Sequence, residues 1–328
     1  ILKHDQAKQD ADGSDRIVFL NNGGYLTIGT DVYLLAGYND SDNYAIVYGG
    51  CLNGSTSEDV HISISSGTYR MVYGGCGNSG SQTGETIITI NGNVTISETV
   101  SGGNFHTNSG KQKDNPDKKT KITINSPLNV QNIYDYDELT IGVTGTDPVT
   151  KENKNVTVSQ TFNSQRASGY EGVTILKGGS ELVLSGNSTS YVRQMGRLKL
   201  ASDAQENAKL SFARTSGNAK NTSNSNLVRL RQPDPLYMVE NQNVNKKHRI
   251  EVGYSSKNPA VGDIVFYLPG VPDTAEDKAK QVSIDRLKDC FVNAEGKHLD
   301  SKGKFVVMIA KPEQRTIELI DKSVGLSI

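Results

Sequence analysis

The residues of this chain best suited to chemistry are the carboxylates of one short segment, Tyr134–Glu138. If the segment is a strand, Asp135 and Asp137 share one face of it, with Glu138 directly after them. Paired carboxylates are what glycoside hydrolysis requires, and clustered carboxylate oxygens are what Ca²⁺ prefers. We therefore take these three as the catalytic candidates, and Tyr134 and Tyr136 as candidates for binding a sugar. The alternative is a solvent-exposed acidic corner without a ligand.

Other possible metal ligands are sparse. Asp40 and Asp42, in the segment Asn39–Asn43, are the calcium candidates, although this segment lacks the Gly and the distal Glu of an EF-hand loop. The histidines are scattered and none has a ligand-like partner at short spacing; they are His4, His61, His106, His248 and His298. Apart from calcium, the sequence predicts no cofactor.

Four tyrosines recur at one spacing. The step from Tyr44 to Tyr69 is the same as the step from Tyr48 to Tyr73. One interpretation is an exposed aromatic ladder that stacks on sugar rings or packs on a host protein. The other is structural stacking of the rings on one another. The absence of Trp counts against the sugar-binding version.

Two cysteines share this spacing, because the step from Cys51 to Cys76 equals that between the paired tyrosines. Stacked neighbours about 4.8 Å apart are within reach of a disulfide, but in-register parallel neighbours do not favour its usual torsion. The sequence therefore leaves a Cys51–Cys76 disulfide open and favours a buried stack of the two thiols. Cys290 is expected to be a core thiol.

The spacing of these residues comes from a repeat. Val47-Tyr48-Gly49-Gly50 returns one step later as Val72-Tyr73-Gly74-Gly75, and after a slightly longer step as Val100-Ser101-Gly102-Gly103. The Gly-Gly pairs suit corners, because glycine reaches positive φ without a Cβ clash.

Short alternating segments lie between these corners. They include Val60–Ile64, Ile88–Ile90, Ile122–Ile124 and Val173–Ile175, and their alternation predicts strands with Ile and Val inward and Thr and Ser outward. Strands this short are stable when each stacks on its counterpart from the previous turn. The sequence therefore predicts an all-β parallel β-helix, a solenoid with three short strands and three corners per coil and Asn ladders at the corners. Right-handed connections are the rule between parallel strands.

A change of composition suggests the domain organisation. The β-helix is predicted over residues 1–240, and Pro233 and Pro235 favour a boundary near its end. Residues 241–328 are expected to form a C-terminal capping region or a small α+β unit, with a helix over Thr274–Phe291. Two polar inserts, His106–Lys119 and Gly145–Asn155, are expected to be loops that either bind a partner or lie in solvent.

The Val-Tyr-Gly-Gly repeats, alternating strands and Asn/Gly corners resemble the β-helix (pectate-lyase-like) repeat region of adhesin-like surface proteins of Gram-positive gut bacteria. Asn258–Val265 resembles the segment that often closes such repeats. The resemblance implies a non-enzymatic module at the cell surface or in the cell wall, which binds a host surface protein or a glycan through outer strands and inserts. A polysaccharide lyase or glycoside hydrolase on the same scaffold is one alternative, and a passive stalk is another.

The composition narrows the class of protein further. The chain has 328 residues, with 35 Lys and Arg against 36 Asp and Glu, and this balance argues against a nucleic-acid-binding protein. No apolar run is long enough to predict a membrane-spanning helix. Hydrophobic residues make up 35% and aromatic residues 6%, which fits a thin core along a repetitive fold. The chain starts at Ile1 rather than at Met, and because its composition looks extracellular we expect a piece of a longer, processed protein; the alternative is a cytosolic protein with a trimmed start.

Overall fold

The structure is a computed structural model of the chain, and its described part is made of strands without a helix. It describes residues 17–29, 45–77, 80–103, 119–142, 156–161, 172–186, 193–200, 208–214, 228–230, 236–238, 249–254, 264–267, 291–292, 306–309 and 316–320. The chain divides into two compact units, with the boundary between Thr140 and Ile141. The all-β class predicted from the sequence is confirmed for these residues.

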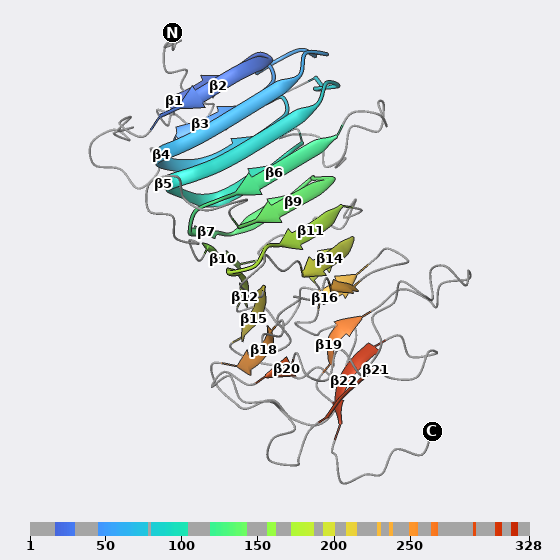
Figure 1. The fold of residues 1–328 in the computed structure, drawn as a ribbon. Coiled ribbons are helices and arrows are strands. Elements are labelled where there is room, and N and C mark those ends of the chain that lie inside the picture. The colour runs from blue at the N-terminus through green and yellow to red at the C-terminus, as the bar shows by residue number, and fades with distance from the viewer. Residues whose placement is uncertain are drawn as a thin grey trace. The chain divides into compact units, whose positions relative to one another are not determined.

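The first unit contains the repeat. Its strands are β1 (Ile17–Leu20), β2 (Gly24–Ile28), β3 (Ala45–Tyr48), β4 (Val60–Tyr73), β5 (Thr86–Ser101), β6 (Thr120–Ile124), β7 (Leu128–Val130), β8 (Asn132–Tyr134) and β9 (Glu138–Ile141). β1, β3, β4, β5, β6 and β9 follow one another in a sheet (Figure 1). In addition, β2 pairs with β4 and β8 pairs with β5. The pairings with a defined register in this unit are all parallel.

The register confirms the repeat read from the sequence. Val47 pairs with Val72, which pairs in turn with Val100, so equivalent residues of successive repeats are neighbours across the sheet. Ile62, Ile88 and Ile122 form a second such row. The longer step from Ile88 to Ile122 therefore leaves the pairing of the strands intact.

The strands of the repeat are longer than the sequence predicts. β4 has 14 residues and β5 has 16, where much shorter segments were expected. Their pairing contains two register shifts, between Ile64 and Ser66 and between Tyr69 and Met71. Irregularities of this kind bend a strand while pairing continues on either side. The bends at these shifts therefore lie inside continuous strands, whereas the Gly-Gly pairs directly follow the ends of β4 and β5.

The core of the first unit is a set of stacked aliphatic rows. Ile62, Ile88 and Ile122 are each 1% exposed or less, and so are Ile64, Ile90 and Ile124. Alternate residues of the same strands are more exposed, as the period-2 pattern predicts. Burying one such aliphatic side chain contributes about 1.5–3 kcal/mol, so the rows supply the main driving force for stacking.

β3 is buried on both of its faces. All four residues of β3 are buried, although successive side chains in a strand point to opposite faces. Val47 belongs to the aliphatic rows, whereas Ile46 and Tyr48 belong to a separate apolar cluster with Tyr73 and Tyr134. Two apolar layers therefore enclose this part of the sheet.

The Gly-Gly corners are confirmed in position, but the predicted reason for them is wrong. Gly49, Gly74 and Gly102 are not among the residues with positive φ. A Cβ on Gly74 would lie 2.3 Å from Thr86 Cγ2, and one on Gly49 would lie 2.4 Å from Val60 Cγ1. The side chain of the first residue of the following strand fills the space that a Cβ would need at the corner. Only glycine, which has no Cβ, fits at this position.

The second unit continues the parallel pairing. Its strands are β10 (Val156–Thr161), β11 (Val173–Leu176), β12 (Ser180–Gly186), β13 (Arg193–Met195), β14 (Arg197–Leu200), β15 (Lys209–Arg214), β16 (Val228–Leu230), β17 (Leu236–Met238), β18 (Arg249–Tyr254), β19 (Ile264–Tyr267), β20 (Phe291–Val292), β21 (Val306–Ile309) and β22 (Thr316–Ile320).

These strands form three parallel ladders, β10-β12-β15-β18-β20, β13-β16-β19 and β11-β14-β17. From β12 to β19, consecutive strands belong to the first, second and third ladder in turn, and this order then repeats. β22 is antiparallel to both β19 and β21. Between two successive strands of one ladder, the chain therefore forms one strand in each of the other two ladders.

One segment of the second unit has the opposite alternation from the predicted one. In β11, Thr174 and Leu176 are fully buried, whereas Val173 and Ile175 are partly exposed. Ile175 pairs with Lys199, and Leu176 pairs with the buried Leu200. Leu176 therefore lies in a buried row with Leu200. A shift of the alternation by one residue turns every side chain of a strand to the opposite face.

Several predictions fall outside the described residues. They are the helix over Thr274–Phe291, of which only Phe291 is described, as part of β20, and the two inserts, of which only Lys119 is described. Pro233 and Pro235 lie outside as well. The division at residue 240 stays a prediction.

Candidate functional site

The carboxylates of Tyr134–Glu138 form a corner between β8 and β9 rather than a strand face. Asp135 has a left-handed backbone, with φ of 56°, and its Oδ2 accepts a hydrogen bond from Ser101 Oγ at 3.1 Å. Glu138 Oε1 accepts one from Thr140 Oγ1 at 3.3 Å. Each of these two carboxylates therefore accepts a hydrogen bond from a hydroxyl of its own strand or of a neighbouring strand.

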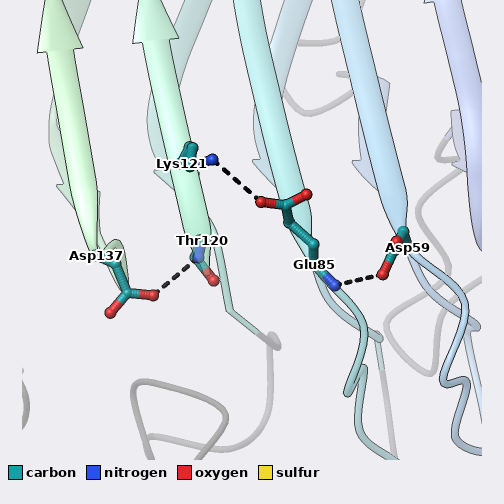
Figure 2. Close-up of polar contacts among 5 residues, drawn as sticks. All are labelled: Asp59, Glu85, Thr120, Lys121 and Asp137. Atoms are coloured by element: carbon teal, nitrogen blue, oxygen red, sulfur yellow. Dashed lines mark hydrogen bonds and ion pairs between the residues drawn. The ribbon is translucent and has the colours of Figure 1, made fainter. Parts of the chain in front are cut away.

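Asp137 connects the corner to β6. Its Oδ2 accepts a hydrogen bond from the Thr120 backbone N–H at 2.8 Å, and its own N–H donates to Thr120 O at 2.9 Å. Figure 2 shows a similar contact two strands away, where Asp59 Oδ1 accepts from the Glu85 backbone N–H at 2.8 Å. In both cases an Asp placed just before one strand binds a backbone N–H at the start of a neighbouring strand of the sheet.

The repeat tyrosines lie in the interior. Tyr48 and Tyr73 are 4% and 1% exposed, and their rings stack at 5.7 Å between centroids. Tyr73 Oη and Tyr134 Oη are 3.2 Å apart and share a hydrogen bond. Of the two interpretations, the exposed ladder is wrong for these residues, and structural stacking of the rings describes them.

Tyr69 and Tyr136 are buried as well. Tyr69 donates a hydrogen bond from its hydroxyl to Ser66 O at 2.9 Å, and burial raises its pKa well above the usual range. Tyr136 is 6% exposed. Tyr44 lies outside the described residues.

The two repeat cysteines are not joined by a disulfide, and they lie next to each other in adjacent repeats. Gly77 N donates to Cys51 O at 2.8 Å, and Cys51 Sγ donates to Asn22 Oδ1 at 2.9 Å. Cys76 is fully buried, and this burial raises the pKa of its thiol. Cys290 lies outside the described residues.

The calcium candidates Asp40 and Asp42 lie outside the described residues. Within the ranges that are described, no three His, Cys, Asp or Glu side chains are grouped closely enough to hold a metal ion. One predicted polar ladder is present, because Asn125 Nδ2 donates to Asn91 Oδ1 at 3.0 Å.

A different set of residues is presented to solvent, on the outer face of β2, β4, β5 and β6. Its most exposed member is Tyr25, with 80% of its surface accessible. Tyr25 pairs in register with His61, and the two rings stack at 4.4 Å with 17° between their planes. The same register continues to Ile87 and Lys121, both partly exposed. We call these four residues the aromatic row.

A second row runs parallel to the first, two residues further along each strand. Thr27, Ser63, Thr89 and Thr123 are register partners of one another, and Thr27 is the most exposed of them. We call them the hydroxyl row. Neighbouring strands are about 4.8 Å apart and the rows about 7 Å, so the hydroxyls lie beside the aromatic row at regular intervals.

At one end of this face, the positive charge of Lys121 is paired with the negative charge of Glu85. Lys121 Nζ lies 3.1 Å from Glu85 Oε1, in an ion pair at the starts of β5 and β6 (Figure 2). The two rows themselves contain no carboxylate. The outer face thus combines an exposed aromatic ring, aliphatic surface and hydroxyl groups with little net charge.

Tyr25 was not predicted as a site residue, whereas the alternation of Val60–Ile64 predicts His61 on the outward face of its strand. The available signal was the alternation of Leu26 and Ile28 in Gly24–Ile28, which puts Tyr25 and Thr27 on the outer face. The alignment of Tyr25 with His61 could not be obtained this way, since the step between them is longer than the step of the repeat.

No protein-family model, curated protein or solved structure matches the chain. Among the described residues, no helix has the length and apolar character needed to cross a membrane. The functional assignment therefore depends on the residues and geometry of the chain itself.

Proposed function

We propose that this chain is a non-enzymatic binding module of an extracellular, adhesin-like bacterial surface protein, built on a parallel β-helix. Three ladders visited in turn are what the coils of a β-helix would produce, and the antiparallel β21 and β22 would suit a cap. The location at the cell surface or cell wall follows from the resemblance of the repeat. Its partner is a host surface protein or a glycan.

The observation that carries the proposal is the outer face of β2, β4, β5 and β6. An aromatic ring that is 80% exposed and held by a stacked His presents a binding surface at little entropic cost. The candidate carboxylates are instead hydrogen-bond acceptors for Ser101, Thr120 and Thr140. This arrangement favours binding over hydrolysis.

A combined screen of the purified chain tests this function. We expect saturable binding to at least one glycan or host extracellular protein, and no depolymerisation of polysaccharides. Depolymerisation that disappears in Asp135→Asn or Asp137→Asn would contradict the proposal and favour an enzyme. A chain inert in both screens would be a passive stalk.

A further inference from the structure

We propose that the aromatic row and the hydroxyl row bind a neutral oligosaccharide, with the Tyr25 ring as the surface on which a sugar ring packs. This inference rests on the proposed binding function and assigns its ligand class and its site. The site differs from the tyrosines first considered for this role, because Tyr48, Tyr69 and Tyr73 are buried.

The Tyr25 ring has the properties that stacking on a sugar requires. One of its faces packs on His61 with 17° between the ring planes, and its 80% exposure leaves the remaining surface in solvent. The C–H face of a pyranose is apolar and flat enough to pack on an aromatic ring, and the phenol hydroxyl gives the same ring a polar tip. His61 fixes the orientation of Tyr25 before the ligand arrives, which reduces the entropy lost on binding.

The hydroxyl row supplies the polar half of the site. Thr27 and Ser63 are the next outward residues on the two strands that carry Tyr25 and His61, about 7 Å along each strand. A sugar packed on Tyr25 directs its ring hydroxyls sideways, where threonine and serine hydroxyls both donate and accept hydrogen bonds. Thr89 and Thr123 extend these partners over two further strands.

The size and the charge of this surface favour a glycan over a protein. Three strand spacings by the distance between the rows give a patch of roughly 14 Å by 7 Å. That is on the order of 100 Å², whereas a stable protein partner covers about 800 Å² on each side. Lys121 is paired with Glu85 and no carboxylate lies in either row, so no charge selects an ionic ligand.

The test is calorimetric titration of the full chain with neutral gluco-, manno-, galacto- and xylo-hexasaccharides, with hexagalacturonate as the anionic comparison. We expect saturable binding of at least one neutral hexasaccharide. Tyr25→Ala should raise its Kd about tenfold, because the packing surface is lost. Tyr25→Phe keeps the ring and should change Kd by less than about threefold, since it loses at most one exposed hydroxyl.

The matched control is Thr95→Ala, an exposed threonine on β5 outside both rows, which should bind as the unchanged chain does. Tyr25→Ala should also keep the melting temperature, because the side chain is exposed, so that lost affinity does not report unfolding.

The outcomes distinguish a failure of the proposed sugar site from a failure of the proposed binding function. Glycan binding that Tyr25→Ala leaves unchanged would overturn this site while the binding function stands. Binding of hexagalacturonate alone, or of host proteins alone, would overturn the neutral-sugar assignment and also leave the function standing. A chain that binds neither glycans nor proteins would overturn both.

Discussion

At the scale of single residues, the first glycine of each corner is under a tight steric constraint. A Cβ on Gly74 would lie 2.3 Å from Thr86 Cγ2 and 2.8 Å from Gly102 O. Both neighbours belong to the following repeat, so neither can move without disturbing the stacking of strands.

Gly74→Ala should therefore lower the free energy of unfolding by about 1–3 kcal/mol, the usual cost of an extra methyl group in a packed site. Denaturant titration measures the change. Gly29→Ala is the control, because a Cβ there meets nothing within 4 Å. Introducing Gly74→Ala together with Thr86→Ser should recover part of the loss; equal losses at positions 74 and 29 would refute the steric explanation.

The two repeat cysteines allow a second test at this scale. Because burial raises the pKa of the Cys76 thiol, little reactive thiolate forms at neutral pH, whereas Cys51 is partly exposed. Iodoacetamide should therefore alkylate Cys51 faster than Cys76 at neutral pH, as peptide mapping of the native chain would show.

The same pKa predicts a pH dependence. A thiol whose pKa is higher in the folded than in the unfolded chain stabilises the fold below the unfolded value of about 8.5, and this stabilisation is lost as the pH rises through the folded value. Cys76 alkylation should therefore increase as the pH rises above that unfolded value. Alkylation of both thiols at one rate would contradict the burial of Cys76.

At the scale of elements, the acidic corner joins strands. Asp137 accepts the Thr120 N–H at 2.8 Å, at the start of β6. Asp137→Ala should lower the free energy of unfolding by about 1 kcal/mol, because this N–H loses its partner. Asp137→Asn keeps an acceptor oxygen and should cost clearly less. Equal losses in the two variants, measured by denaturant titration, would show that the side-chain oxygen does not hold β6.

The elements of the repeat were predictable and their lengths were not. The rows of Ile and Val follow from alternation, and the step of the repeat aligns Val47 with Val72 as the structure does. The register shifts inside β4 and β5 leave no mark in that alternation. In β11 the sequence offers two possible phases, and only the neighbouring Leu200 shows that Leu176 is the inward residue.

The candidate site was predicted less well than the fold. Alternation shows that a side chain points out of the sheet, but not whether another apolar layer covers it, as one does over Tyr48 and Tyr73. The exposed pair Tyr25 and His61 depends on a longer step that the repeat does not contain.

At the scale of the whole molecule, the proposal is a parallel β-helix with a capped end. Circular dichroism of the full chain should then show mainly β structure, with helix well below the one third typical of globular proteins. A helical fraction above about one third would contradict the architecture, wherever in the chain the helices lay.

The central claim is that the outer face of β2, β4, β5 and β6, and not the acidic corner, is the functional surface. The most direct test compares Tyr25→Ala with Asp135→Asn in one titration with the neutral hexasaccharide that the unchanged chain binds best. Asn tolerates the left-handed backbone of residue 135 and keeps an acceptor for Ser101, so this variant should fold. We predict about tenfold weaker binding in Tyr25→Ala and unchanged binding in Asp135→Asn. Unchanged affinity in Tyr25→Ala together with lost affinity in Asp135→Asn would contradict the claim.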